Sequence, residues 1–109
     1  MPLLVDGQLI GQVDTKLHRA DRRLELRHVR FEPWFTMGEA PPAAAWGAVT
    51  HERGFTGLTD AAWSLAAFTG AQAVEVGRVT PPSMRAAVRK AIGRMVSGVG
   101  NKLKLPLID

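Results

Sequence analysis

The segment from Gln12 to Glu32 constrains the fold of this chain more than any other part of its sequence. It has two arms in which every second residue belongs to one face; these residues are Val13, Thr15 and Leu17 on the first arm, then Leu24 and Leu26 on the second. A period of two is typical of β-strands with one buried face. The segment therefore predicts an antiparallel β-hairpin whose turn lies within the basic sequence HRADRR.

The register of this hairpin follows if the turn is placed at Ala20-Asp21. The opposed pairs are then Leu17 with Leu24 and Thr15 with Leu26 on the inner face, and Lys16 with Glu25 and Asp14 with Arg27 on the outer face. Each opposite-charge pair is worth about 0.2–1 kcal/mol, and a slip of one residue would place leucines opposite charges. Because alanine is a poor residue for a two-residue turn, we expect a four-residue loop from Arg19 to Arg22.

The alternation changes phase after Arg27, because Val29 and Phe31 now occupy the apolar face. One extra residue near Arg27-His28, a β-bulge, would produce this change and bend the strand. Pro33 has no N–H to donate to a ladder, so we expect the strand to end there.

A second, tighter hairpin precedes this one. Leu3–Val5 and Gln8–Ile10 flank Asp6-Gly7, and Asp-Gly suits the positive φ values of a two-residue turn. The two hairpins together predict a three-stranded meander. Such a sheet needs a helix or another sheet to cover its apolar face.

Residues 33–57 have no clean period and contain three prolines, four glycines and four aromatic rings. A disordered linker is poorer in aromatic residues, so we expect an irregular segment held in place by those rings, with room for a short helix over Ala43–Val49.

Thr59 predicts the N-cap of the first long helix, with Asp60 in its first turn and Gly70 at its C-terminal end. Leu58 and Trp63 have the spacing of a hydrophobic staple. Nearly every residue inside this helix is apolar, which predicts burial on most sides.

Residues 73–79 predict a fourth strand, and Thr80-Pro81-Pro82-Ser83 predicts the start of a second helix. Its apolar residues follow at helical spacing: Met84, Ala87, Val88, Ala91, Ile92, Met95 and Val96. Gly98 and Gly100 would end it and leave a C-terminal tail over residues 98–109. We expect one α+β domain over residues 1–109, an antiparallel β-meander of three strands plus a fourth, covered by two helices, in the order β-β-β-(loop)-α-β-α.

Positive charge is concentrated in two places, although the net charge is only +4. The hairpin gives the first candidate site for nucleic acid: Lys16, His18, Arg19, Arg22 and Arg23. The region between Glu75 and Asp109 contains no acid and gives a secondary basic surface: Arg85, Arg89, Lys90, Arg94, Lys102 and Lys104. Basic surfaces attract phosphate backbones and other polyanions. The alternative is that each is a solvated surface that keeps the protein in solution.

Other classes of function have little support. The chain has no cysteine, so a disulfide framework and a thiolate metal site are excluded. No apolar run approaches the length of a membrane span, and MPLLVDG lacks the features of a secretory signal, so we expect a cytoplasmic protein with no membrane partner. The three histidines, His18, His28 and His51, are isolated in sequence. We expect no catalytic residue, metal or cofactor.

The sequence from Leu3 to Pro33 resembles the C-terminal β-rich domain of the YcaQ/AlkZ-type winged-helix DNA glycosylases. The residues that match are Asp6-Gly7, Gly11, Asp14, Lys16, Arg19, Arg22 and Glu32-Pro33. The later order is similar too: a helix ending LAAFTGA, a strand VEVGRVTPP and a helix SMRAAVRKAI. The resemblance covers about Leu3–Ile92.

This resemblance implies a DNA-repair accessory module in which His18, Arg19, Arg22 and Arg23 meet duplex DNA. The family's catalytic Gln-rich motif lies upstream of the matched region, and this chain has no Gln-x-Gln, so we expect it not to be an enzyme. One alternative is a protein-interaction module or split subunit that docks on a separately encoded partner or on a second copy. Its apolar tail could add to a sheet edge through Leu103, Leu105, Leu107 and Ile108. Another is a remnant without independent function.

Overall fold

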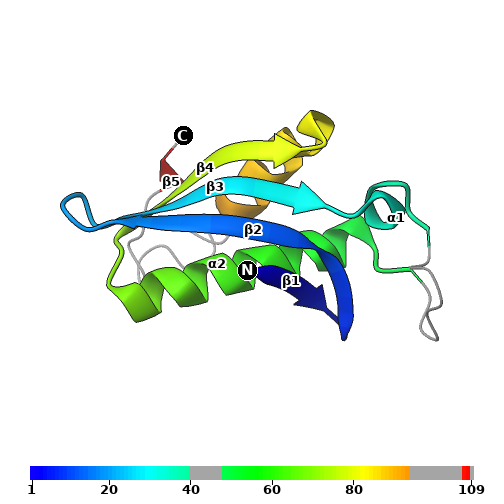
Figure 1. The fold of residues 1–109 in the computed structure, drawn as a ribbon, viewed down its shortest axis with the longest axis horizontal. Coiled ribbons are helices and arrows are strands. Elements are labelled where there is room, and N and C mark those ends of the chain that lie inside the picture. The colour runs from blue at the N-terminus through cyan, green and yellow to red at the C-terminus, as the bar shows by residue number, and fades with distance from the viewer. Residues whose placement is uncertain (40–47, 94–106, 109) are drawn as a thin grey trace.

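A computed structural model describes residues 1–39, 48–93 and 107–108 of this chain. One mixed sheet runs in the order β1-β2-β3-β4-β5 (Figure 1). The strands are β1 (Pro2–Val5), β2 (Gln8–His18), β3 (Arg23–Phe31), β4 (Ala73–Thr80) and the two-residue β5 (Leu107–Ile108). The helices are α1 (Pro33–Thr36), α2 (His51–Thr69), the 3-10 turn η1 (Pro82–Met84) and a helix over residues 85–93. The α+β class predicted from sequence is confirmed.

The two longer helices cover one face of the sheet and leave the other open. Buried side chains from the strands meet those of α2 and of the helix at residues 85–93 in one cluster, which includes Ile10, Val29, Val76, Trp63 and Ile92. The indole N–H of Trp63 donates to the carbonyl of Ile92 at 3.3 Å, so the two helices are also joined to each other. Burial of Met84, Val88 and Ile92 confirms the apolar spacing predicted for the second helix, whose Met95 and Val96 lie outside the described residues.

Both hairpin turns form where the sequence predicts them. In the first turn Asp6 and Gly7 both have positive φ, at 54° and 77°. In the second, β2 ends at His18 and β3 begins at Arg23, which leaves the four-residue loop predicted from Arg19 to Arg22.

The register of β2 and β3 is as predicted for the half of the hairpin next to this loop. Leu17 lies opposite Leu24, Lys16 opposite Glu25, Thr15 opposite Leu26 and His18 opposite Arg23. The register then shifts between Asp14 and Thr15, which is the predicted bulge with Arg27 as the extra residue. The predicted pair of Asp14 with Arg27 required the bulge to come after Arg27. Since Arg27 is itself the extra residue, Asp14 faces His28, and the predicted pair is wrong.

The fourth strand corrects the expectation of a wholly antiparallel sheet. β4 pairs with β3 in parallel, with Leu24 opposite Val74 and Leu26 opposite Val76. Antiparallel neighbours can be joined by a short turn, but parallel neighbours need a crossover, and α2 provides it by returning along the covered face. β5 pairs in parallel with β4 at Val74 and Glu75.

The long helix begins nine residues earlier than predicted, because its N-cap is not Thr59. Its N-cap is Thr50, whose hydroxyl accepts a hydrogen bond from the backbone N–H of Arg53 at 3.1 Å. Thr59 is instead buried inside the helix, so it caps nothing, and Leu58 with Trp63 does not form a staple at a helix start. The predicted C-terminal end at Gly70 is confirmed by its left-handed φ of 77°.

Two glycines explain why this helix lies so close to the sheet. A Cβ atom added at Gly54 would collide with the ring of Phe35, and one added at Gly57 would collide with Val5. Both residues lie in α2, within the stretch expected to be irregular. They act as sites of close packing and not as turn residues.

Aromatic contacts hold the described part of residues 33–57, as expected. Phe35 packs against Phe31 and Phe55 with ring centroids 5.2 and 6.1 Å apart, and the His51 ring donates to the Phe35 carbonyl at 2.9 Å. Pro33 starts the short helix α1, and Glu39 is the last residue described before 48. The proposed helix over Ala43–Val49 falls largely outside the described residues, and Val49 itself is not helical. No helix within residues 1–39 and 48–93 is long and apolar enough to cross a bilayer.

The capping assignment gives a direct stability test. Replacing Thr50 with alanine removes the side-chain acceptor at the helix N-terminus and should lower the free energy of unfolding by about 1 kcal/mol, measured by urea denaturation. The Thr59 hydroxyl has no hydrogen-bond partner among the described residues, so Thr59→Val should leave stability unchanged or raise it. A larger loss for Thr59→Val than for Thr50→Ala would reverse the assignment of the cap.

Candidate nucleic-acid interface

The loop between β2 and β3 forms the basic end of the molecule. Figure 1 shows this hairpin reaching past the end of α2, with its tip at one end of the long axis. Arg19 and Arg22 are both exposed there. The backbone N–H of Arg22 donates to the carbonyl of Arg19 at 3.3 Å, and Arg22 has a positive φ of 50°. The turn therefore presents two guanidinium groups on a closed loop.

The two residues at the base of the loop are engaged within the protein. The imidazole of His18 is 2.8 Å from the carboxylate of Glu25, and the guanidinium of Arg23 pairs with Glu75 of β4 and lies 3.5 Å from Asp21. The Arg23 side chain is only 19% exposed. Because their donors face acids, His18 and Arg23 orient the loop more than they offer charge to a ligand.

The hydrogen bond from His18 also changes the acidity of its partner. It lowers the pKa of the Glu25 carboxyl below its ordinary value of 4.5, with smaller contributions from the positive charges of Arg27 and Arg23, against a desolvation penalty that acts the other way. Glu25 was expected to pair with Lys16, which lies directly opposite. The carboxylate bonds to His18 instead, and no ion pair to Lys16 occurs in the described part of the chain.

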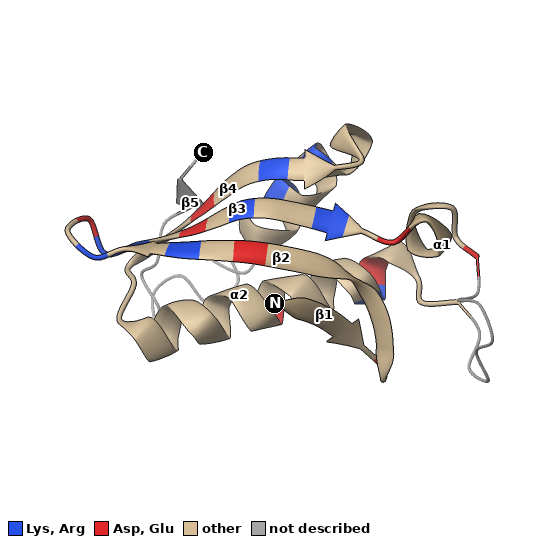
Figure 2. Ribbon diagram, in the orientation of Figure 1, with Lys and Arg blue, Asp and Glu red and all other residues tan. Residues whose placement is uncertain are grey.

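The open face of the sheet carries further basic residues. Figure 2 shows Lys and Arg positions along β2, β3 and β4, on the strands that the helices cover from the other side. The exposed cations of these strands are Lys16, Arg27, Arg30 and Arg78. Of the three acids among them, Glu25 and Glu75 are half-buried and paired internally, and only Asp14 is fully exposed. This face therefore has a surplus of accessible positive charge.

Sequence reasoning did not include Arg27, Arg30 or Arg78 in the first candidate site. The parallel pairing of β3 and β4 brings Arg78 beside His28, and the bulge exposes Arg27. Arg30 alternates with the buried residues Val29 and Phe31, and this alternation could have identified it as an exposed residue. Arg78 could not be located without the order of the strands.

The secondary basic surface is not assembled as one patch in the described residues. The guanidinium of Arg85 donates to the carbonyls of Gly77 at 2.9 Å and Val76 at 3.2 Å, so this arginine binds the edge of β4. Arg89 is half-buried, and exposed Lys90 lines a groove that also contains Glu52 and Asp60. Arg94, Lys102 and Lys104 lie outside the described residues. On the helical side, Lys90 therefore shares its groove with two acids.

The histidines occupy three separate environments. His18 contacts Glu25, the His28 imidazole lies 2.7 Å from the hydroxyl of Thr80, and His51 donates to the Phe35 carbonyl. Among the residues described, no group of three or more His, Asp or Glu side chains is arranged to hold a metal ion.

Comparisons with protein-family models, with curated proteins and with solved structures gave no match for this chain. The resemblance to winged-helix DNA glycosylases therefore rests on the residues that carry it.

The pair of His18 and Glu25 predicts a specific acid response. Because the folded-state pKa of Glu25 is lowered, its carboxylate stabilises the fold above the unfolded pKa of about 4.5, and this contribution is lost as pH falls through the folded value. Glu25→Gln should therefore reduce stability at neutral pH by a small amount and flatten the loss of stability between about pH 5 and pH 3. Urea denaturation across this pH range measures both effects.

His18→Ala is the companion variant, because it removes the donor and leaves the carboxyl. It should flatten the same part of the pH profile. If both variants keep the wild-type slope, the acid response arises from other carboxyl groups.

Proposed function

We propose that this chain is a non-catalytic DNA-binding module of the DNA-repair accessory type, which holds duplex phosphates on the β2–β3 hairpin and the adjoining open face of the sheet. The observation that carries this proposal is the surplus of accessible cations on that side. Six cations are exposed there, Lys16, Arg19, Arg22, Arg27, Arg30 and Arg78, against two exposed acids, Asp14 and Asp21, since Glu25 and Glu75 are half-buried and paired internally.

The shape of the hairpin supports the same function. Arg19 and Arg22 lie in the loop that projects from one end of the sheet past the end of α2, and Lys16 lies on β2 close to this loop. Contacts of lysine and arginine with phosphate oxygens give affinity that is independent of base sequence and falls with salt. A protruding loop can also enter a groove of the duplex.

The resemblance to the C-terminal β-rich domain of winged-helix DNA glycosylases supports a role at DNA and supplies the repair context. Residues Lys16, Arg19 and Arg22 belong both to the resemblance and to the exposed basic surface. His18 and Arg23, which the resemblance also places at DNA, serve here as braces of the loop through Glu25 and Glu75.

The alternative is a protein-interaction module or split subunit without nucleic-acid binding. One specific observation favours it: Phe68, near the end of α2, is 89% exposed. Another weakens it, because Leu107–Ile108 of the apolar tail pairs with β4 of the same chain. The tail could add to a sheet edge in the same chain or in another, and this pairing is within the same chain.

The experiment is a fluorescence-anisotropy titration of a short labelled duplex at several salt concentrations between about 50 and 200 mM. Arg19→Gln/Arg22→Gln should weaken binding and lower the slope of log K against log salt by about 1.8, since each lost phosphate contact removes about 0.9.

Arg53→Gln/Lys90→Gln is the matched control, because it removes two positive charges from the helical side. This pair should leave the slope close to the wild-type value. An equal effect of both double variants would indicate attraction by net charge alone. Absence of binding by the wild-type protein at the lowest salt would contradict the DNA-binding function and favour the docking alternative.

A further inference from the structure

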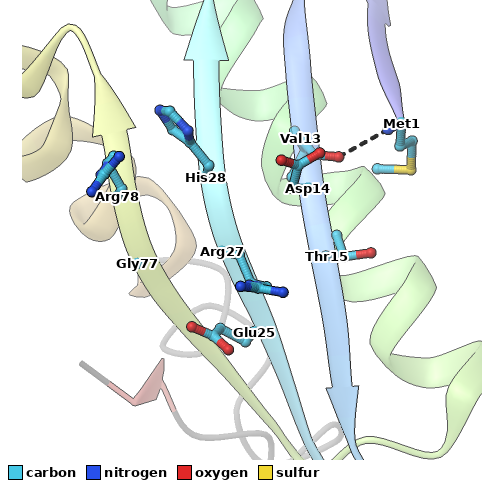
Figure 3. Close-up of a pocket in the computed structure, with 9 residues that line it drawn as sticks. All are labelled: Met1, Val13, Asp14, Thr15, Glu25, Arg27, His28, Gly77 and Arg78. Atoms are coloured by element: carbon cyan, nitrogen blue, oxygen red, sulfur yellow. Dashed lines mark hydrogen bonds between the residues drawn. The ribbon is translucent and has the colours of Figure 1, made fainter.

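The open face of the sheet contains a hollow of about 830 Å³ beside the bulge of β3. Its lining comes from β2, β3, β4 and the N-terminal residue: Met1, Val13, Asp14, Thr15, Glu25, Arg27, His28, Gly77 and Arg78. Figure 3 shows the side chains of Glu25, Arg27, His28 and Arg78 on the same side of the strands, away from α2. The hollow is therefore a polar basin on the solvent side.

The β3–β4 side of this basin is basic because the pairing of the two strands brings basic side chains together on one face. His28 lies directly opposite Arg78 in the parallel ladder, so the two side chains leave the sheet on the same face. Arg27 is the extra residue of the bulge and is exposed. Gly77 lies between Val76 and Arg78, and a Cβ there would be 2.8 Å from the Arg27 carbonyl, so only glycine fits where β4 passes the bulge.

None of these basic groups forms an ion pair within the described residues. The ion pairs of residues 1–39 and 48–93 do not include Arg27 or Arg78. His28 bonds to the Thr80 hydroxyl through Nε2 at 2.7 Å. When that hydroxyl is the donor, the proton of the neutral ring is on Nδ1, which can then donate to an anion.

The opposite side of the basin is acidic. Asp14 on β2 is exposed and faces His28 across the ladder, whereas Glu25 is already bonded to His18. A simple anion would be repelled by the Asp14 carboxylate. A ligand with a phosphate at one end and hydrogen-bond donors next to it would be complementary to both sides.

We infer that this basin binds one nucleotide unit, with its phosphate between Arg27, His28 and Arg78 and a sugar hydroxyl or base amine donating to Asp14. The guanidinium groups supply charge-assisted hydrogen bonds to the phosphate oxygens, and planar donors suit that geometry. The inference rests on the proposed nucleic-acid function and names a unit of the ligand and its place on the sheet.

The test is an NMR titration of backbone amides with cytidine 5′-monophosphate, inorganic phosphate and cytidine, each at constant ionic strength. Cytidine 5′-monophosphate should give saturable shifts at His28, Gly77 and Arg78 and bind more tightly than phosphate, while cytidine should be the weakest. Arg27→Gln/Arg78→Gln should weaken both phosphate-containing ligands at least about tenfold.

Asp14→Asn separates the two ends of the site. Removing its charge should strengthen inorganic phosphate by a few-fold and reduce the preference for the nucleotide over phosphate. Sulfate is the reference anion, and sulfate binding equal to that of the nucleotide would overturn the assignment. So would shifts that do not saturate, or that persist in Arg27→Gln/Arg78→Gln.

This experiment also separates the inference from the proposed function. The mononucleotide titration uses no duplex and does not involve Arg19 or Arg22. Duplex binding that depends on those two arginines, without saturable nucleotide shifts at Gly77, would remove the basin alone. Saturable nucleotide binding without any duplex binding would overturn the duplex-binding function and keep the site. The Arg27→Gln/Arg78→Gln protein should retain the wild-type unfolding curve, because both side chains are exposed and outside the core.

Discussion

The pairing of β2 with β3 determines most of the structure. The ladder places Leu24, Leu26 and Val29 on the covered face, where they become part of the core. After Arg27 the apolar residues of β3 change from even to odd positions. The register shift between Asp14 and Thr15 absorbs this change and keeps the covered face apolar. A strand without the extra residue would turn Val29 and Phe31 toward solvent. The bulge therefore protects the core on one side and exposes Arg27 on the other.

The parallel strand β4 links this hairpin to the helical layer and to the polar face. Its valines at 74, 76 and 79 are buried under the helices, while Glu75 holds Arg23 at the base of the basic loop. The same strand supplies Arg78 beside His28. Stability and the proposed binding surface thus share one set of strands, and changes in strand order would disturb both.

Local sequence patterns predicted the hairpin register, the two turns, the bulge and the end of α2 at Gly70, because each depends on residues that are near one another in the chain. The start of α2 was missed because Gly54 and Gly57 are typical of loops, and only the positions of Phe35 and Val5 show why small residues are needed. The direction of β4 was missed for a similar reason. Contacts between distant segments decide such features, and alternation within one strand carries no information about them. The engagement of Arg23 by Glu75 and of Arg85 by the β4 carbonyls belongs to the same class.

Arg85 has a consequence for how this protein behaves among its own copies. In the described part of the chain β5 pairs with β4 at Val74 and Glu75, and the carbonyls of Val76 and Gly77 accept hydrogen bonds from the Arg85 guanidinium. An exposed strand edge is a template on which another chain can add a strand and begin aggregation. Carbonyl groups that already accept hydrogen bonds from a charged side chain cannot pair with a new strand. By binding these two carbonyls, Arg85 therefore disfavours the addition of a strand from another copy at this part of β4.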